Sequence, residues 1–415
     1  MTPAKTIPTD LLTPLGAYLR LRADGGSSFL LESVEQGRLG RHSFIGSGRR
    51  LVSFEEAEAL GAPVVGYLAY DHVARLEPTV PMPVAGTDLP ESRFVVADTL
   101  VRYDHGSGTA TVLAGERDEI AQRLERELVF KEHKVRSPGG ATRRFPTQAE
   151  YEARVRRIQE HIRAGDAFQV VLSQRAERPT GASALELYRA LRRVNPSPYL
   201  FLLELDGLAL IGSSPETLVK CQGARASLNP IAGTTHPGEG DAERLLASEK
   251  DRAEHVMLVD LGRNDLSRVC RAGSVRVERY LEPERFSHVT HLVSEVTGEL
   301  RDGVTPFDLL RACFPAGTVS GAPKIRAMQI VSELEGHRRG PYAGAVGYAL
   351  PDGTLDTCIA IRTIVLHDGV ARLQAGAGIV ADSDPGAEHV ECLNKLAALE
   401  AAIDLAEAEF AADAR

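Results

Sequence analysis

The stretch Pro315-Ala-Gly-Thr-Val-Ser-Gly-Ala-Pro-Lys-Ile-Arg326 stands directly before an apolar run, 325–334, with helical spacing. Its prolines and glycines fix an unusual backbone path, which frees N–H groups to face a ligand. Lys324 and Arg326 add positive charge where the following helix would begin. Because N–H groups and positive charge at a helix start attract anions, the stretch predicts a loop that holds an anionic group.

On both sides of this loop, short apolar runs are separated by tight-turn signals. After it, runs at 343–350, 357–366 and 371–375 are separated by Pro351-Asp-Gly and His367-Asp-Gly, which predicts an antiparallel meander. Before it, runs at 199–205 and 208–211 flank Asp206-Gly207, which predicts a hairpin. Helices are expected at 241–261, 305–312 and 388–406. Since strands do not alternate regularly with helices, we expect an α+β fold with large antiparallel β-sheets packed with helices.

A basic segment rich in glycine and proline, residues 133–146, lacks periodicity and is typical of a linker. It separates an amino-terminal region, 1–132, whose short alternating runs predict strands, from a second region, 147–415. The second region opens with Thr147-Gln-Ala-Glu150, which spells a helix capping box. We therefore expect two domains joined by a linker.

Composition and charge exclude several classes of protein. The 415 residues are 43% hydrophobic and 25% charged, as in an ordinary globular protein, and the net charge of −9 argues against general nucleic-acid binding. No apolar run approaches the roughly 20 residues of a membrane-spanning helix. Five widely spaced cysteines without a CxxC pair predict free thiols in a reducing compartment. We expect a cytoplasmic enzyme with neither nucleic-acid nor membrane partners.

Two pairs of carboxylates are candidates for a metal site. Asp251 and Glu254 are three residues apart in a predicted helix, and so are Glu388 and Glu391, so each pair shares one helical face. Four carboxylates around one cavity would suit Mg²⁺, which prefers oxygen ligands and keeps several waters. Spacing alone favours the alternative that these are solvated surface acids.

Other polar residues stand out against apolar surroundings. Gly376-Ala377-Gly378 follows a predicted strand but lacks the third glycine of a dinucleotide-binding motif, so it indicates either close packing or N–H donors for a carboxylate. Arg362 lies among apolar strand residues, where it needs an anionic partner, either a structural carboxylate or a ligand. His288 and His291 lack further ligands at zinc-site spacing, so a half-buried core histidine is the alternative to a proton-transfer group.

The loop string PAGTVSGAPK resembles the signature of the chorismate-using enzymes, especially the large components of anthranilate synthases. Three further runs are similar to strings of the same family. They are the run from Glu254 to Asp265, the run from Gly376 to Pro385, and the run that contains His291 in HLVS. Leu30-Leu31-Glu32-Ser33 and Asn195-Pro-Ser-Pro-Tyr199 resemble the two halves of its tryptophan-binding pocket, with Leu200 where methionine is common. The resemblance implies that 1–132 carries part of the tryptophan site and that 147–415 is the chorismate-binding catalytic domain.

The resemblance also implies roles for individual residues. The catalytic residues would be His291, Glu216, Asp251 and Thr318. Chorismate would be held by Gly233, Thr234, Tyr342, Arg362, Gly376, Ala377, Gly378 and Lys395. The cofactor Mg²⁺ would be bound directly by Glu254 and Glu391 and through water by Glu388 and Asp251, which is usually glutamate in the family. Tryptophan would bind as an inhibitor at Leu31, Ser33, Pro198, Tyr199 and Leu200.

Two positions discriminate among the relatives. Isochorismate and salicylate synthases use a lysine to activate water at the position where this chain has Gln169. Aminodeoxychorismate synthases commonly carry a nucleophilic lysine at the position where this chain has Ala232. Both differences favour anthranilate synthase, which adds ammonia at C2 of chorismate as the C4 hydroxyl leaves and then eliminates pyruvate. The alternatives are an aminodeoxychorismate or aminodeoxyisochorismate synthase and a non-catalytic tryptophan-binding regulator.

A partner subunit is also implied. The sequence has no GxSxG motif, no Walker A motif and no glutaminase-like cysteine motif. In the family, a separate glutamine amidotransferase subunit supplies the ammonia, so we expect a hetero-oligomer.

Overall fold

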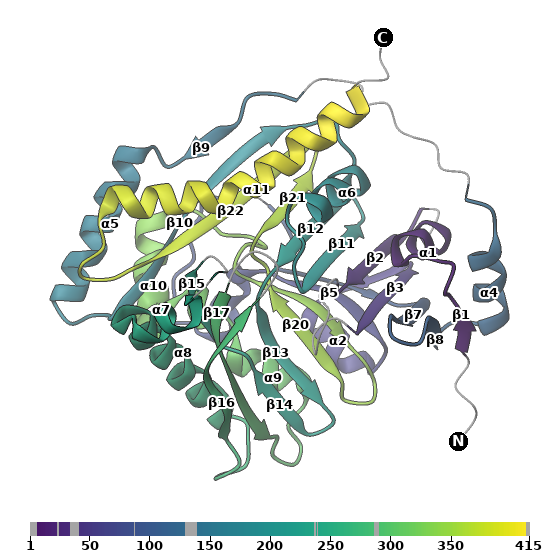
Figure 1. Ribbon diagram of the computed structural model, residues 1–415, viewed down its shortest axis with the longest axis horizontal. Coiled ribbons are helices and arrows are strands. Elements are labelled where there is room, and N and C mark those ends of the chain that lie inside the picture. Colours follow the sequence, from purple (N-terminus) through teal and green to yellow (C-terminus); the bar gives the residue numbers. More distant parts are fainter. Residues whose placement is uncertain are drawn as a thin grey trace.

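The computed structural model describes residues 6–22, 25–33, 41–86, 88–128, 139–235, 238, 240–285 and 290–411. Two large antiparallel sheets dominate it, as the turn signals predicted (Figure 1). The 12-stranded sheet has the order β1 (Thr6–Pro8), β8 (Thr109–Ala114), β7 (Thr99–Asp104), β3 (His42–Gly48), β2 (Ser27–Glu32), β11 (Tyr199–Leu205), β12 (Leu208–Ser214), β21 (Thr363–His367), β22 (Val370–Ile379), β10 (Gln169–Pro179) and β18 (Gly321–Ala322), with β9 (Arg143–Phe145) paired to β10. The 10-stranded sheet has the order β15 (Ile231–Thr235), β17 (Thr290–Glu299), β14 (Arg225–Leu228), β13 (Thr217–Gln222), β20 (Leu355–Ile359), β19 (Ala345–Ala349), β5 (Val64–Leu68), β6 (Ser92–Val96) and β4 (Arg50–Val52), with β16 (Arg276–Arg285) paired to β17.

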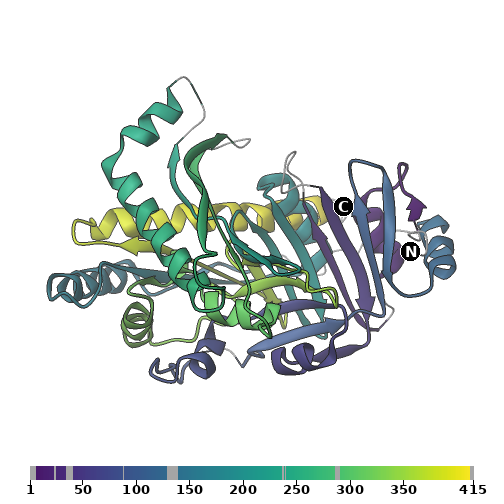
Figure 2. The same cartoon turned by 90° about the horizontal axis from the view of Figure 1, so that it is seen from below.

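Helices cover the outer faces of these sheets. They are α1 (Pro14–Leu21), α2 (Phe54–Leu60), α3 (Val73–Leu76), α4 (Arg117–Glu125), α5 (Gln148–Arg163), α6 (Ala184–Val194), α7 (Asp241–Ala247), α8 (Glu249–Ser267), α9 (Pro306–Cys313), α10 (Lys324–Glu335) and α11 (Pro385–Ala411). The long helix α11 lies along the 12-stranded sheet together with α5 and α6, whereas α7 and α8 extend away from the body of the molecule (Figures 1 and 2). Among the described residues, no helix is both long and apolar enough to cross a membrane.

The core between the sheets is apolar on both sides. Phe29 and Phe201 of the 12-stranded sheet pack in one buried cluster with Tyr67 and Val346 of the 10-stranded sheet. Burying such side chains contributes about 1.5–3 kcal/mol each, so face-to-face packing of the sheets is a principal source of stability. All five cysteines are buried free thiols, which confirms that prediction.

Strands from both predicted domains are paired within each sheet. In the 12-stranded sheet β2 pairs with β11, and in the 10-stranded sheet β5 pairs with β19. Residues 133–138 of the predicted linker, 133–146, lie outside the described residues. Its segment 143–145 forms β9, which pairs with β10, and is therefore not an irregular connection. The functional division at this segment stays a prediction.

Local signals located most element boundaries correctly. The Thr147–Glu150 capping box begins α5 as predicted, with both reciprocal hydrogen bonds present. The predicted single helix 241–261 is instead two helices, because Ser248 ends α7 and its hydroxyl accepts a hydrogen bond from the Asp251 N–H at the start of α8. A serine that binds a neighbouring N–H favours a helix start over a helix interior.

Candidate active site

The chain crosses from one sheet to the other at two adjacent places. Between β12 and β13 it passes through Glu216, and between β20 and β21 it passes through Arg362. The Ile359 N–H donates to the Glu216 carbonyl (3.0 Å), and the Ser213 N–H donates to the Arg362 carbonyl (3.1 Å). The predicted strand 357–366 is therefore wrong as one strand, because it breaks where Arg362 adopts a φ of 50°. The two crossovers place a carboxyl group and a guanidinium group at the seam between the sheets.

Glu216 is joined to the loop 315–326, which brings two predicted catalytic residues together. The Thr318 hydroxyl donates to Glu216 Oε1 (2.9 Å). Burial raises the pKa of Glu216 to about 7, against the opposing effects of the Thr318 hydrogen bond and the charge of Lys395. A carboxyl group that keeps its proton near neutral pH is suited to general acid catalysis.

The charges of the loop have a different role from the one predicted. Lys324 Nζ is ion-paired with the buried Asp265 (2.7 Å), and Arg326 donates to Asp166 (2.9 Å). Both cations are therefore neutralised by the protein and fix the start of α10. The prediction that they attract an anionic ligand is wrong, although the loop still contributes Thr318 to the site.

The end of β22 is a close-packed strand beside Tyr342. A Cβ atom on Gly376 would lie 2.8 Å from the Tyr342 hydroxyl, and one on Gly378 would lie 2.4 Å from the Gln169 amide nitrogen. Lys395, on α11, donates to the Gly376 carbonyl (2.8 Å). Ala377 is buried on the opposite face of this strand, against α5 and α10. Glycine is required at 376 and 378 because the neighbouring polar groups occupy the space of a side chain.

Arg362 has the properties of a ligand-binding arginine. Burial lowers its pKa, with opposing effects from Tyr342 and Glu391. Within the described part of the chain, Arg362 forms no ion pair with a carboxylate. A desolvated guanidinium without a carboxylate partner favours binding of an anion, and Arg forms bidentate hydrogen bonds with carboxylates.

His291 lies on β17, across from the backbone of β15. Its Nδ1 donates to the Gly233 carbonyl (2.9 Å), and Thr234 is its register partner, although the Thr234 side chain is outside the described set. Burial lowers the pKa of His291, so the ring is neutral near pH 7. With the proton on Nδ1, Nε2 is the basic nitrogen. His288 lies outside the described residues.

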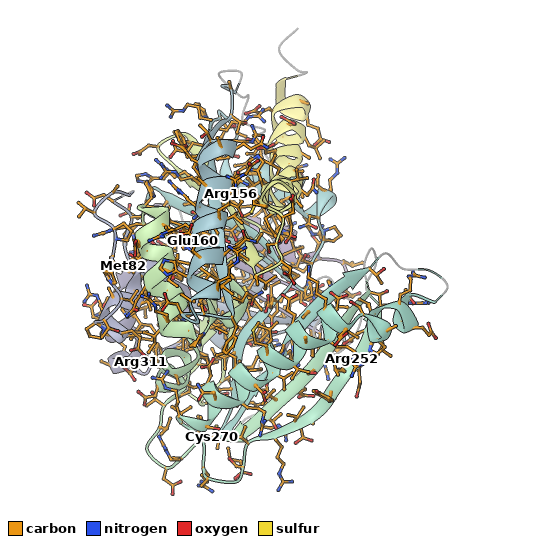
Figure 3. The ribbon with its side chains drawn as sticks, turned by 90° about the vertical axis from the view of Figure 1, so that its left-hand side faces the viewer. Met82, Arg156, Glu160, Arg252, Cys270 and Arg311 are labelled. Carbon is orange, nitrogen blue, oxygen red and sulfur yellow. The ribbon has the colours of Figure 1, made fainter. Side chains whose placement is uncertain are left out.

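The four predicted metal ligands are on two helices and are not gathered around one point. Among the described residues, no group of three or more His, Cys, Asp or Glu side chains is close enough to bind a metal ion. Glu391 is instead ion-paired with Lys395 (2.6 Å), and Glu254 accepts a long hydrogen bond from Gln169 (3.4 Å). The metal site formed by these four carboxylates therefore stays a prediction. Helix α8, with Arg252 near one end and Cys270 just beyond the other, stands apart from α5 and α11 in Figure 3.

The donor set nevertheless fits a hard cation. Burial and the charge of Glu391 raise the pKa of Glu388, against a hydrogen bond from Ser383. Carboxylates that repel one another are stabilised by a bound cation, and oxygen donors suit Mg²⁺. Gln169 bonds to Glu254 and lies against Gly378, so it connects α8 to the glycine strand.

Comparison with known proteins agrees with this arrangement. The family model described as chorismate binding enzyme matches residues 16–401. The chain belongs to the chorismate binding enzymes. Anthranilate synthase component 1 of Thermus thermophilus is 43% identical over 97% of this chain and 98% of its own, and that of Streptomyces coelicolor is 44% identical over 96% and 88%. The crystal structure of anthranilate synthase component I from Streptococcus pneumoniae has a TM-score of 0.79 at 32% identity, covering 95% of this chain and 99% of that one.

A second cavity of this chorismate binding enzyme lies between the sheets, away from Glu216. All five residues that the resemblance implied for tryptophan line it: Leu31, Ser33, Pro198, Tyr199 and Leu200. Pairing of β2 with β11 brings the two sequence strings together, and the Ser33 hydroxyl donates to the Pro198 carbonyl (2.8 Å). Phe44, Tyr348 and the carboxylate of Asp356 complete the walls. The cavity thus combines apolar surfaces with a carboxylate that is also ion-paired with Lys220 (3.2 Å).

Sequence reasoning missed a buried ion pair that supports the active site. Arg339 binds Glu335 (2.7 Å) and also donates to the Val319 and Val171 carbonyls. Glu335 in turn accepts hydrogen bonds from the N–H and hydroxyl of Ser173. The pair thereby ties the loop 315–326 to β10. The spacing of four residues between Glu335 and Arg339 was the available signal.

Proposed function

We propose that this chain is the large, chorismate-binding component of an anthranilate synthase, a lyase that converts chorismate and ammonia to anthranilate and pyruvate in the first step of tryptophan biosynthesis. The observation that carries the proposal is Glu216, which has a pKa raised to about 7 by burial and is held by Thr318 at the sheet seam, where Arg362 also lies. The full-length similarity to anthranilate synthase component 1 proteins supports the same reaction.

The side chains supply an acid and a base for the two steps. In the first, ammonia bonds to C2 of chorismate, both ring double bonds shift by one position, and the C4 hydroxyl leaves as water with a proton from Glu216. The added nitrogen then loses a proton to solvent. In the second, His291 Nε2 removes the C2 proton, the bond to the enolpyruvyl oxygen breaks, and the released enol becomes pyruvate as the ring becomes aromatic. The Gly233 carbonyl fixes the tautomer that this step needs.

Substrate binding is assigned to the cations and the glycine strand. Arg362 would bind one carboxylate of chorismate, and the backbone at Gly376 and Gly378, beside Tyr342, would lie against the other. Lys395 positions the Gly376 carbonyl and holds Glu391 in the absence of a metal ion.

We assign Mg²⁺ to Glu254 and Glu391, with Asp251 and Glu388 acting through water. Bound there, Mg²⁺ would neutralise a substrate carboxylate and draw electron density from the ring. Glu391 must release Lys395 for this, which leaves that cation beside Gly376 and the substrate.

Gln169 and Ala232 distinguish this assignment from the related reactions. Gln169 presents an amide, which donates to Glu254 and does not act as a base toward water. Ala232 is buried in β15 and offers no amine for a covalent bond to substrate. With water activation and covalent attachment to a lysine both disfavoured, the remaining reaction is addition of ammonia to chorismate, with the ammonia supplied by solution or by a partner subunit.

Regulation and partners complete the proposal. The cavity lined by Leu31 and Leu200 would bind tryptophan as a feedback inhibitor, with its ring against Phe44 and Tyr348 and its ammonium group toward Asp356. A separate glutamine amidotransferase subunit would supply ammonia in a hetero-oligomer. The five reduced, buried cysteines support a cytoplasmic location.

Anthranilate fluorescence from the purified chain with chorismate, Mg²⁺ and excess ammonium salt at mildly alkaline pH tests the activity. We expect a signal that EDTA abolishes and tryptophan lowers. Chorismate loss without anthranilate would instead identify an aminodeoxychorismate or aminodeoxyisochorismate synthase. Tryptophan binding without chorismate loss, even with the amidotransferase partner present, would identify a non-catalytic regulator.

A further inference from the structure

A pair of adjoining cavities lies on the same face of β10 and β22 as Gly376. Both are lined by Arg175, His337 and Gln374. In the register of the two strands, Ser173 pairs with Gly376 and Arg175 pairs with Gln374, so the cavities continue along the strands away from the glycines. Tyr342 lines the smaller cavity, while its hydroxyl lies against Gly376. It therefore separates the cavities from the proposed chorismate site.

The walls of these cavities carry excess positive charge. They include four arginines that form no ion pair within the described part of the chain: Arg154, Arg175, Arg338 and Arg372. The acids in the same walls are already engaged, because Glu335 is paired with Arg339 (2.7 Å), Glu177 with Arg143 (3.4 Å), and Glu150 caps its own helix. The charge of the arginines is thus left for a ligand or for solvent.

Two of these guanidinium groups present buried N–H donors without a hydrogen-bond partner. They are Nη1 of Arg175 and Nε of Arg372, each unpartnered among the described residues. Arg175 is held in place by stacking over the Phe145 ring, with 4.9 Å from the guanidinium carbon to the ring centroid. Burial lowers its pKa. A buried polar group without a partner costs free energy, and an anion between the two strands would remove that cost.

The remaining wall of the smaller cavity is apolar. It is formed by Leu89, Pro341 and Val365 together with the Tyr342 ring. An inorganic anion bound to the arginines would leave the apolar wall exposed to water. A ligand with an acid group at one end and a flat apolar body at the other would satisfy both the arginines and the apolar wall.

We propose that the cavities bounded by Arg175 and Arg372 form a second, separate binding site for a small organic carboxylate with an apolar body, of the aromatic monocarboxylate class. The carboxylate accepts hydrogen bonds from the two guanidinium groups, and the body packs on Val365 and Tyr342. The site is distinct from the proposed chorismate site because Tyr342 and the network of Gln374 with Ser173 (2.7 Å) lie between them.

Calorimetric titration with benzoate tests the proposal, with acetate as a carboxylate that lacks the apolar body. The titrations use the R362Q chain, so that the proposed chorismate site contributes little. We expect R362Q to bind one equivalent of benzoate more tightly than acetate. Adding R175Q or R372Q should weaken benzoate binding by about tenfold or more, the effect of losing a charged hydrogen bond.

Two controls make the result decisive. R175Q and R372Q alone should keep chorismate turnover and the thermal unfolding midpoint near those of the wild type, which shows that they fold. In each, the affinity of this site for benzoate should fall by about tenfold or more, as in the double variants. R175K, which keeps the charge without the planar fork, should fall between wild type and R175Q. Absence of benzoate binding by R362Q, or equal affinity of R362Q and both double variants, would overturn the proposal.

Discussion

Replacing Glu216 with glutamine is expected to stabilise the chain above pH 7 while it removes turnover. Burial raises the pKa of Glu216 from its ordinary 4.5 to about 7. Below pH 4.5 the group is protonated in both the folded and the unfolded chain, so it costs nothing. Between pH 4.5 and 7 the unfolded chain loses the proton and the folded chain keeps it, so stability falls as pH rises.

The size of the effect follows from the pKa shift. At 1.36 kcal/mol per pKa unit, a rise from 4.5 to about 7 corresponds to about 3 kcal/mol of lost stability at pH 8. Glutamine has no charge to bury, and its side-chain oxygen still accepts the hydrogen bond from Thr318. We therefore expect Glu216→Gln to raise the free energy of unfolding by up to about 3 kcal/mol at pH 8 and to leave it unchanged at pH 4.

Urea unfolding of the wild type and of Glu216→Gln at a series of pH values measures this difference, from the shift in midpoint at a common slope. Glu299→Gln, at an exposed position, is the matched control and should show no such dependence on pH. Turnover of chorismate by Glu216→Gln should fall by about 10²-fold or more, as for loss of a general acid. A midpoint difference that is the same at pH 4 and pH 8 would refute the burial argument.

Three further variants probe the rest of the site. His291→Met should trap the amino intermediate, so that chromatography shows chorismate consumed without anthranilate; normal anthranilate output would exclude His291 as the base. Gly376→Ala should raise the KM for chorismate by about tenfold or more because its Cβ would meet the Tyr342 hydroxyl, and adding Tyr342→Phe should restore part of the loss. Ser33→Leu should fill the cavity beside Pro198 and raise the tryptophan concentration for half-inhibition by about tenfold, with uninhibited turnover retained.

Signals within a few residues predicted the local structure well. The Asp206-Gly207 turn joins β11 to β12 in two-residue fashion, and the Thr147 capping box begins α5 as expected. The α+β class followed from the same local signals. These features depend on backbone preferences and neighbouring side chains, which a single sequence displays directly.

Features that depend on distant parts of the chain could not be predicted in the same way. The apolar run 357–366 reads as one strand, but its two halves pair with different sheets, so the break at Arg362 is fixed by long-range pairing. Lys324 looked available to a ligand because its partner Asp265 lies 59 residues away. The family resemblance named the residues of the active site, but their distances from one another came only from the fold.

The seam between the sheets explains why the chemistry is located there. At each crossover the backbone leaves regular pairing, and a side chain can be buried without joining either hydrophobic core. Glu216 thereby loses water and gains only the Thr318 hydroxyl, which is enough to hold its oxygen and too little to keep it ionised. Arg362, at the neighbouring crossover, is buried with no carboxylate partner among the described residues. If Glu216 were paired with Arg362, both would be charged and neutralised. Keeping them separate leaves Glu216 with a raised pKa and Arg362 without a carboxylate partner among the described residues, which are the states that the proposed reaction requires.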